Sequence, residues 1–349
     1  MSKFIITVHR LPRLTQIAFL FFLAGISLAA EAAEGFLLPG LLKPQTLTVD
    51  SSQVFITEGT TIYIYSLPGG QLQKKFGRAG EGPGEFKDDG LGVKLEIKPD
   101  EIIVTSAGRL SYFTRAGEFK RETQVTDPRK FQFKSLGDNY VGTATAREKD
   151  KIYIVLGLYD NGLSMVKELY RYKHPFWPRS KDINAVDLRV CSFYVYHDKI
   201  FVDDSQGRIL IFNRQGEKIS EIAPTYEDIK VTEAHKTRYM ETWKTSLKEE
   251  YEAFKERLKF PGTFPRIRGY QVTDGKIYIV TYKEEQGKSQ MYIYSEEGKF
   301  LKTVFVPLVE IDMLNPHMYN YYTIKQGKLY WLEETADTEE WKLHITDIE

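Results

Sequence analysis

The feature that most constrains how this chain folds is a strand-rich unit that recurs along it. Each clear copy reads as an apolar strand, a polar turn, a second strand, a glycine turn and a third strand. The clear copies occupy 47–76, 95–123, 193–222 and 270–306, and the glycines of their last turns are Gly70, Gly117, Gly216 and Gly298. Glycine suits such turns because it adopts a positive φ without steric cost.

The spacing of these glycines indicates a fixed period. Gly70 and Gly117 are 47 residues apart, and Gly117 and Gly216 are 99 apart, which is about two periods. A weaker copy at 137–172 fills that interval, and a shortened copy occupies 321–349. Strand units of roughly 40–50 residues are typical of β-propeller blades. We therefore predict an all-β fold, a six-bladed β-propeller.

Two points of this count stay open. A seventh unit hidden in 30–46 or 305–321 is the alternative to six blades. The copy at 321–349 also shows only three strands, although a propeller must close its ring. We expect a segment between Gly35 and Thr46 to supply the missing outer strand of that last blade.

Residues 1–32 have the organisation of a secretory signal peptide. Residues 1–13 carry three basic side chains and no acidic one, 17–28 are apolar, and Ala30-Glu31-Ala32 is a small-x-small cleavage site. The apolar run is shorter than the ~20 residues that a spanning helix needs. We expect cleavage near Ala33, export to the periplasm or the extracellular space, and no stable membrane insertion of the mature propeller over 33–349. An uncleaved N-terminal anchor is the alternative.

Charge and cysteine content exclude several classes of protein. The chain has 48 basic and 48 acidic residues and one cysteine. Removal of 1–32 leaves the balance close to neutral, whereas a protein that binds nucleic acid draws most of its affinity from phosphate neutralisation. We therefore expect no nucleic-acid partner. The single Cys191 excludes an internal disulfide framework and cysteine-rich metal modules.

Two segments carry a family resemblance. Residues 77–86, GRAGEGPGEF, resemble the G-x-x-G-x-G-P-G-x-F linker between blades of NHL-type repeats. Residues 200–209, IFVDDSQGRI, resemble the strand–turn–strand core of the same repeats. The chain thus looks like a divergent bacterial six-bladed propeller of the NHL-repeat/TolB-like type. This resemblance implies that 77–86 is a turn between blades.

The glycines of 77–86 do not form a nucleotide-binding motif. A P-loop ends in Gly-Lys-Ser/Thr, but here Gly82 is followed by Pro83-Gly84. A dinucleotide fingerprint that starts at Gly80 needs glycine at position 85, where the chain has Glu85. The alternative to a plain turn is a loop whose backbone amides or Arg78 contact an anionic ligand.

Residues 225–265 interrupt the repeats with a predicted helical insertion. The stretch 226–260 lacks glycine and proline, and Pro261 ends it. Its apolar residues follow helical spacing at Met240, Trp243, Leu247, Tyr251, Phe254 and Leu258. Eight acidic and eight basic residues in this stretch argue against a basic membrane-surface helix. We expect a helix that covers one propeller face; a lid or a partner-docking helix is the alternative.

Candidate site residues come from two places. Asp203 and Asp204 follow a strand, and we expect one of them to hydrogen-bond the turn at 205–207 and the other to face solvent. The alternative is a calcium or substrate ligand near the central channel. The stretch 172–179 has two prolines and reads as a loop, with His174 and Trp177 as candidate binding residues or as packing partners of the helix.

No catalytic motif is present in the sequence. It lacks H-E-x-x-H, an EF-hand loop and G-x-S-x-G, and its six histidines are not at close metal-ligand spacing. We therefore expect a binding or protein-interaction scaffold that acts on a protein, peptide or glycan partner of the cell envelope and needs no cofactor or metal. The alternative is a lactonase-like hydrolase or lyase that uses the central channel and depends on calcium.

Overall fold

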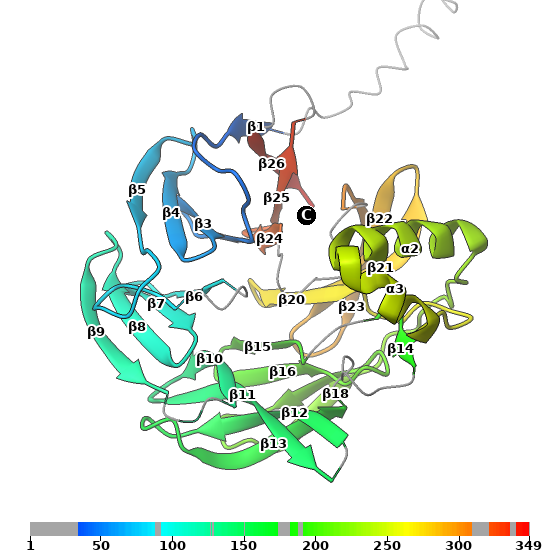
Figure 1. The fold of residues 1–349 in the computed structure, drawn as a ribbon, viewed down its shortest axis with the longest axis horizontal. Coiled ribbons are helices and arrows are strands. Elements are labelled where there is room, and N and C mark those ends of the chain that lie inside the picture. The colour runs from blue at the N-terminus through cyan, green and yellow to red at the C-terminus, as the bar shows by residue number, and fades with distance from the viewer. Residues whose placement is uncertain are drawn as a thin grey trace, which may run out of the picture. The chain divides into compact units, whose positions relative to one another are not determined.

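Six four-stranded antiparallel sheets follow one another around a central axis (Figure 1). The computed structural model describes residues 34–87, 92–125, 127, 129–149, 151–173, 182–187, 191–308, 321–335 and 340–348. The fold described below is that of the unit Gly35–Glu349. The predicted all-β, six-bladed propeller is confirmed.

The first three blades are built from consecutive strands, each listed here from the axis outward. Blade 1 comprises β2 (Thr46–Val49), β3 (Gln53–Glu58), β4 (Thr61–Ser66) and β5 (Leu72–Phe76). Blade 2 comprises β6 (Lys94–Ile97), β7 (Glu101–Ser106), β8 (Arg109–Thr114) and β9 (Phe119–Gln124). Blade 3 comprises β10 (Lys130–Leu136), β11 (Asn139–Glu148), β12 (Lys151–Tyr159) and β13 (Met165–Lys173).

The remaining blades repeat this order. Blade 4 comprises β15 (Phe193–Tyr196), β16 (Lys199–Asp203), β17 (Ile209–Phe212) and β18 (Lys218–Ile222). Blade 5 comprises β20 (Gly269–Thr273), β21 (Lys276–Glu285), β22 (Lys288–Ser295) and β23 (Phe300–Val306). Blade 6 comprises β24 (Tyr322–Lys325), β25 (Lys328–Glu334), β26 (Trp341–Asp347) and the N-terminal β1 (Glu34–Leu37).

Every repeat thus holds four strands, so the three-strand reading of the unit is wrong. The innermost strands are only four to seven residues long, and their turns to the next strand contain two or three residues, so two strands read as one in the sequence. The third copy also begins at Lys130 rather than at residue 137, because β10 precedes the Gly137 turn. The four glycines of the last turns do adopt positive φ, between 66° and 91°.

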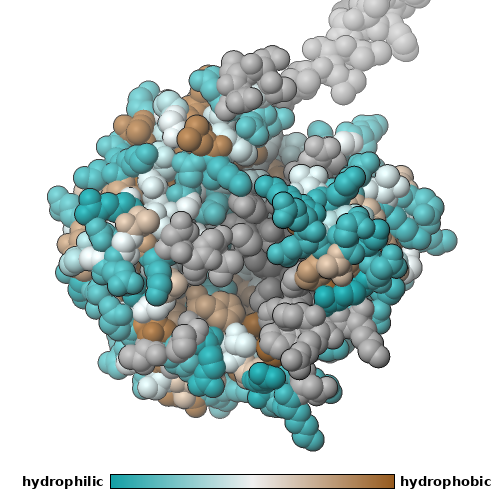
Figure 2. All heavy atoms as spheres, in the orientation of Figure 1, coloured by the Kyte–Doolittle hydropathy of each residue, from teal (hydrophilic) through white to brown (hydrophobic). Residues whose placement is uncertain are grey.

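The apolar middle strands are buried because each blade packs against a neighbour on both faces. In β4 the four central residues are buried, whereas the outer strand β5 is exposed along most of its length. Six hydrophobic clusters fill the six interfaces between consecutive blades, including the interface between blades 6 and 1. Figure 2 shows that one face of the molecule is mostly hydrophilic, with small separate hydrophobic areas.

The N-terminal strand closes the ring, as the sequence predicts. β1 lies beside β26 as the outer strand of blade 6. The chain after it continues the contact, since Leu38 N donates to Trp341 O at 2.8 Å. Leu38 and Leu41 are buried in the cluster between blades 6 and 1. The two ends of the propeller are therefore joined in one sheet.

The insertion is helical but shorter and more broken than the sequence predicts. Its main helix α2 (Glu233–Leu247) begins at the N-cap Thr232, which forms a capping box with His235. Lys248 has a φ of 49°, which ends α2 and leads through a short 3₁₀ turn to α3 (Tyr251–Phe254). A second short turn leads to β19 (Leu258–Lys259), which pairs in parallel with β14 (Ile183–Asn184) from the connection between blades 3 and 4.

The apolar stripe of the insertion is used for packing. Trp243 is buried, and its indole Nε1 donates to Ala185 O at 3.1 Å. Its neighbours in the cluster include Ile183, Tyr239 and Phe264. Trp243 is thus a core residue and is not available to dock a partner. Within the described residues, no helix combines the length and apolarity needed to cross a bilayer.

Candidate functional site in the central cavity

The innermost strands place one equivalent side chain from each blade at the axis. Each of these strands turns into the next through a hairpin whose closing residues are three apart, such as Asp50–Gln53, Leu136–Asn139 and Thr273–Lys276. Side chains alternate along a strand, so the residue two before the closing residue has the same orientation in every blade. We call these six residues the inner ring: Thr48, Glu96, Lys134, Tyr194, Gln271 and Thr323.

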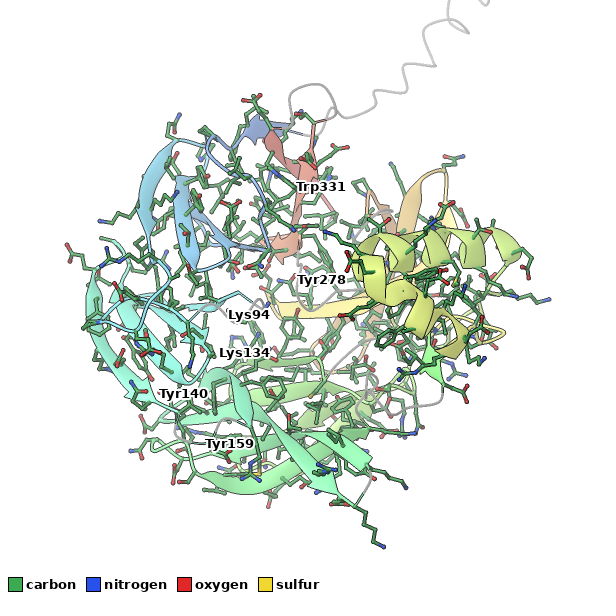
Figure 3. All side chains as sticks on the ribbon, viewed as in Figure 1. Lys94, Lys134, Tyr140, Tyr159, Tyr278 and Trp331 are labelled. Carbon is green, nitrogen blue, oxygen red and sulfur yellow. The ribbon has the colours of Figure 1, made fainter. Side chains whose placement is uncertain are left out.

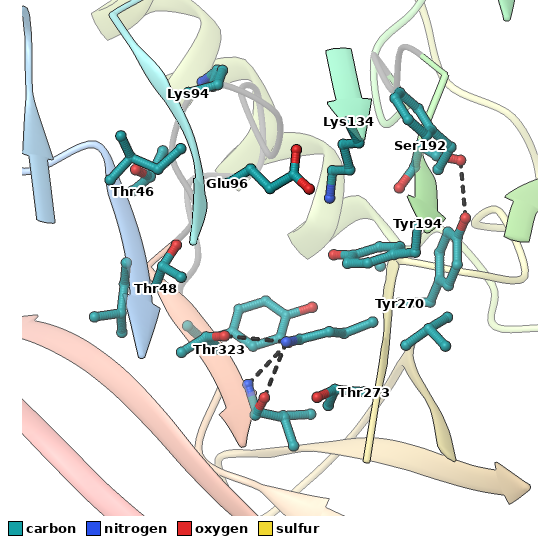
Figure 4. A pocket seen from close by; sticks show the side chains of 18 of the residues that line it. Thr46, Thr48, Lys94, Glu96, Lys134, Ser192, Tyr194, Tyr270, Thr273 and Thr323 are labelled. Carbon is teal, nitrogen blue, oxygen red and sulfur yellow. Dashed lines mark hydrogen bonds between the residues drawn. The ribbon is translucent and has the colours of Figure 1, made fainter. Parts of the chain in front are cut away.

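All six residues of the inner ring line one cavity of about 500 Å³. Figure 4 labels five of them, all but Gln271, and shows their side chains around a common space; Figure 3 places Lys94 and Lys134 on the axial side of their strands. This volume lies in the range of small-molecule pockets, about 300–1,000 Å³. The cavity therefore has the size of a ligand site.

Two members of the inner ring tie neighbouring blades together. Glu96 accepts a hydrogen bond from Ser135 N at 2.9 Å and another from Ser135 Oγ. Gln271 repeats this contact in blade 5, where its Oε1 accepts from Ile324 N at 2.9 Å and its Nε2 donates to Ile324 O at 3.1 Å. In both cases the acceptor binds the residue that follows the next ring member. A carboxylate and an amide thus perform the same structural task.

Lys134 takes no part in these hydrogen bonds between neighbouring blades. Its Nζ lies 4.6 Å from the centre of the Tyr194 ring and 5.9 Å from that of Phe193. Among the residues that the structure describes, it forms neither a hydrogen bond nor an ion pair with a carboxylate. Burial lowers the pKa of Lys134, and the nearby negative charge of Glu96 opposes this shift. The ring thus contains a partly buried lysine whose amino group lies against aromatic rings.

Aromatic side chains form much of the remaining wall. Tyr194, Tyr270 and Tyr322 come from the innermost strands, while Tyr239 of α2 and Tyr282 of β21 line the cavity beside the insertion. Burial raises the pKa of Tyr322 to about 12, so this phenol is protonated at neutral pH. Arg268 lies against Tyr282 and pairs with Glu284, with 3.4 Å between Nη1 and Oε1.

The insertion contributes to this wall through packed rings. Phe264 stacks on Tyr282 with 4.5 Å between ring centres and lies 6.0 Å from Tyr239. Blade-to-blade connections and the turns between second and third strands lie at the same end of an antiparallel blade. The insertion therefore lies at the end of the channel where the innermost strands begin, over blade 5 in Figure 1.

The two predicted aspartates are both turn residues. Asp204 accepts hydrogen bonds from Gln206 N, Arg208 N and Arg208 Nε at 2.9, 3.0 and 2.6 Å. Asp203 accepts from Ser205 N at 2.9 Å. Both residues are buried, so the expectation that one faces solvent is wrong. Asp203 also borders the cavity, whereas the Asp204 carboxylate is fully covered.

The glycine-rich segment forms a closed turn. Phe86 is fully buried between blades 1 and 2, and its backbone bonds Arg78 and Gly80. Glu85 accepts from Gly82 N at 2.8 Å and from Arg78 Nε at 2.7 Å. These bonds lower the pKa of Glu85, with the Gly82 amide as the largest cause. Glu85 therefore occupies the position that an anionic ligand of this loop would take, and Arg78 is not in the cavity.

The other two predicted residues, His174 and Trp177, lie outside the described residues. The end of the same connection is described, and there Ile183 and Val186 pack in the cluster of the insertion. In the described part of the chain, no three His, Cys, Asp or Glu side chains gather in a way that could hold a metal ion.

Comparison with known proteins supports the fold. The sequence matches no protein-family model and no curated protein. Among solved structures, the chain is similar to a Bacteroides fragilis protein named "putative exported protein", with a TM-score of 0.56 and 11% identity over 92% of this chain and 97% of that one. At this identity the similarity shows the fold alone.

Two more distant likenesses have TM-scores below 0.5. The computationally designed Ika8 protein has a TM-score of 0.41 and 9% identity over 90% of this chain and 100% of its own. BamB from Moraxella catarrhalis has a TM-score of 0.33 and 11% identity over 86% of this chain and 71% of its own. Scores this low do not bear on the architecture or the site.

The inner ring was missed in the sequence, although a signal for it is present. Aligning the repeats on their first hairpins places Glu96 and Lys134 at one repeat position. An alignment does not show which contacts each of these side chains makes. Glu96 is engaged by Ser135, 39 residues away, while the adjacent Lys134 is left facing a ring.

Proposed function

We propose that this protein is an exported binding module whose ligand enters the central cavity of the propeller. The observation that carries the proposal is the cavity of about 500 Å³, walled by tyrosine rings and by polar side chains from all six blades. Binding pockets commonly combine such apolar faces with a few convergent polar groups. A peptide end or a glycan end is the expected ligand, and no cofactor or metal takes part.

The acidic residues favour binding over hydrolysis. A lactonase-like site would need carboxylates that converge on the channel and remain available to a metal or substrate. Glu96 is bonded to Ser135 and Asp204 to its own turn. The calcium-dependent hydrolase is therefore the weaker proposal.

The proposal also includes export of the protein and a relationship to the NHL-repeat/TolB-like propellers. The signal-like organisation of 1–32 supports export, and the exported Bacteroides fragilis protein shares the fold. The segments 77–86 and 200–209 support an NHL-repeat/TolB-like kinship. N-terminal sequencing of the protein from the periplasm or medium should find a start near Ala33. A cytosolic protein with an intact N-terminus would contradict export.

The binding proposal is tested with a variant whose cavity is filled by a larger side chain. Gln132 lines the cavity two residues before Lys134, and Gln132→Phe would fill it. We expect ligands found by calorimetry from a panel of envelope peptides and glycans to lose affinity for this variant. The matched control is Gln215→Phe, in an exposed turn of blade 4.

The two variants give opposite expectations. Gln215→Phe should bind as the unmodified protein does. Equal binding by Gln132→Phe, or a failure of every panel member to bind the unmodified protein, would contradict the proposal. Calcium added during the same titrations should change neither affinity nor melting temperature; a calcium-dependent rise would favour the hydrolase.

A further inference from the structure

His235 takes part in the start of the main helix of the insertion in a way that only its neutral form allows. Thr232 N donates to His235 Nδ1 at 3.1 Å, and His235 N donates to Thr232 Oγ1 at 3.3 Å. A backbone N–H can only donate, so Nδ1 must be the acceptor and the ring proton must lie on Nε2. Glutamate or glutamine is the usual residue at this position of a capping box. Here a titratable imidazole occupies it.

The same ring supports the aromatic wall of the cavity. His235 meets Phe264 edge-on, with 4.9 Å between ring centres. Phe264 stacks on Tyr282 at 4.5 Å and lies 6.0 Å from Tyr239, and both tyrosines line the cavity. Tyr239 follows His235 by four residues, so the two side chains lie on one face of α2. A single ring, Phe264, therefore separates His235 from the cavity wall.

The backbone also joins the start of α2 to the segment that carries Phe264. Phe264 N donates to Ile229 O at 2.8 Å, and Val231 N donates to Gly262 O at 3.1 Å. The chain that enters α2 thus pairs with residues 262–264. A displacement of the first turn of α2 would reach Phe264 through both the ring contact and these hydrogen bonds.

Protonation of His235 would remove the acceptor of the capping box. An imidazolium ion carries N–H on both ring nitrogens, so Nδ1 would face the Thr232 N–H with a second donor. It would also place a positive charge in the first turn of a helix, where the helix dipole disfavours cations. Histidine ordinarily gains its proton between about pH 8 and pH 5. We therefore expect this packing to be present at neutral and higher pH and to loosen as the pH falls.

The described residues hold no ion pair that would stabilise the protonated ring. Glu233 on α2 pairs with Lys236 at 2.7 Å, and Glu284 on β21 pairs with Arg268 at 3.4 Å. Besides these groups and the two tyrosines of the wall, further titratable residues flank the contacts of His235 on α2, on the two paired segments and on β21: Asp228, Lys230, Arg238, Arg266 and Lys283. In the described part of the chain, none of them bonds to the imidazole.

We infer that His235 is a positioning residue for the aromatic wall of the cavity and that it holds this wall only while its ring is neutral. At acid pH the first turn of α2 loosens, Phe264 loses its edge contact, and Tyr239 and Tyr282 are less firmly placed. Only the consequence for binding, a lower affinity at acid pH, rests on the proposed function. The packing itself is tested without a ligand.

The experiment is amide hydrogen exchange of the mature protein at pH 8 and pH 5, expressed as protection factors so that the pH dependence of intrinsic exchange is removed. The peptides of interest cover 229–239 and 260–268, and a peptide from β16 is the internal reference. Relative to that reference, we expect protection of the two segments to be about fivefold lower at pH 5, the size of one lost helix cap. Equal relative protection at the two pH values would overturn the inference.

His235→Gln separates the titration from the packing. Glutamine can accept from Thr232 N in the manner of an ordinary capping box, but it does not titrate. We expect protection close to normal at pH 8 and no decrease at pH 5. His235→Lys carries a permanent charge and no acceptor, so it should show low protection at both pH values. A pH-dependent decrease that persists in His235→Gln, or full protection in His235→Lys, would overturn the inference.

Thr232→Ala is the comparison for a purely structural defect. It removes the acceptor of His235 N but keeps the imidazole and the backbone N–H of residue 232. Its protection should be lower at both pH values and should still fall at pH 5. His197→Gln, at an exposed histidine of blade 4, should respond to pH as the unmodified protein does. Loss of the response in His197→Gln would assign it to another histidine and overturn the inference.

The consequence for binding is measured by titrating the tightest ligand from the panel of envelope peptides and glycans at both pH values. We expect the unmodified protein to bind several-fold more weakly at pH 5 and His235→Gln to bind equally at both. Equal affinity of the unmodified protein at pH 8 and pH 5 would overturn the role of His235 at the cavity. If no member of the panel binds, the proposed function fails, and the exchange experiment alone decides the role of His235.

Discussion

At the scale of single residues, charged side chains in this propeller have separate roles that their surroundings define. Asp204 is enclosed and fully bonded, so it fixes the turn between β16 and β17. Lys134 is only partly buried, and its ammonium group lies against the ring of Tyr194. The first arrangement stabilises the fold, and the second leaves a lysine side chain at the wall of the cavity.

Asp204→Ala tests the structural role. The change leaves Gln206 N and Arg208 N without their acceptor and breaks an ion pair with a fully covered carboxylate. We expect a loss of about 2–4 kcal/mol in the free energy of unfolding, measured by urea denaturation. Asp100→Ala, in an exposed hairpin turn, should cost little. An unchanged free energy of unfolding in Asp204→Ala would contradict the structural assignment.

His344 gives the protein a predictable response to acid. It stacks on Trp331 in blade 6 with 4.9 Å between ring centres, and its Nε2 lies 2.7 Å from Glu333 Oε2. Burial lowers the pKa of His344, although Glu333 acts in the opposite direction. The unfolded chain therefore binds the proton more readily, and stability falls as the pH drops below about 6.5, the ordinary histidine value.

His344→Gln should flatten this dependence when melting temperature is recorded from pH 8 to pH 5. His197→Gln is the matched control, because His197 is exposed and Gln326 already occupies the same hairpin position in blade 6. If the melting temperature of His344→Gln fell with pH as steeply as that of the unmodified protein, the account would be contradicted. An equal flattening of this dependence in His197→Gln would contradict it too.

At the scale of elements, the closing strand is the one that joins the two ends of the propeller. A Cβ on Gly35 would lie 2.5 Å from Leu343 O, so only glycine fits where β1 meets β26. We expect Gly35→Ala to destabilise the protein by about 1–3 kcal/mol, and deletion of 33–45 to lower the melting temperature sharply.

Gly262→Ala is the control for this substitution. Its added Cβ would meet nothing within 4 Å, and its backbone needs no positive φ. The same denaturation experiment should find this variant close to the unmodified protein. An unchanged melting temperature after deletion of 33–45 would show that β1 does not hold the ring closed.

Some elements could be predicted from the sequence and others could not. The glycine turns and the closing strand could be predicted because they follow from local conformation and from the need to close the ring. The end of α2 at Lys248 could not, since the apolar spacing continues through it to Leu258. That spacing persists because Trp243, Tyr251 and Leu258 pack in one cluster although the helix is broken.

At the scale of the whole molecule, sixfold repetition explains both the stability and the site. Six similar interfaces bury the middle strands, and the same repetition brings six different side chains to one axis. Repeat position predicts which residues meet there. Their contacts depend on partners in other blades, as the bonds between Glu96 and Ser135 show.

The most direct test of the binding site is a crystal structure of the mature protein soaked with the tightest ligand from the panel of envelope peptides and glycans. The account predicts density for the ligand inside the inner ring, in contact with side chains from several blades. Ligand density on the 77–86 turn or on the outer strands, with an unchanged cavity, would contradict it.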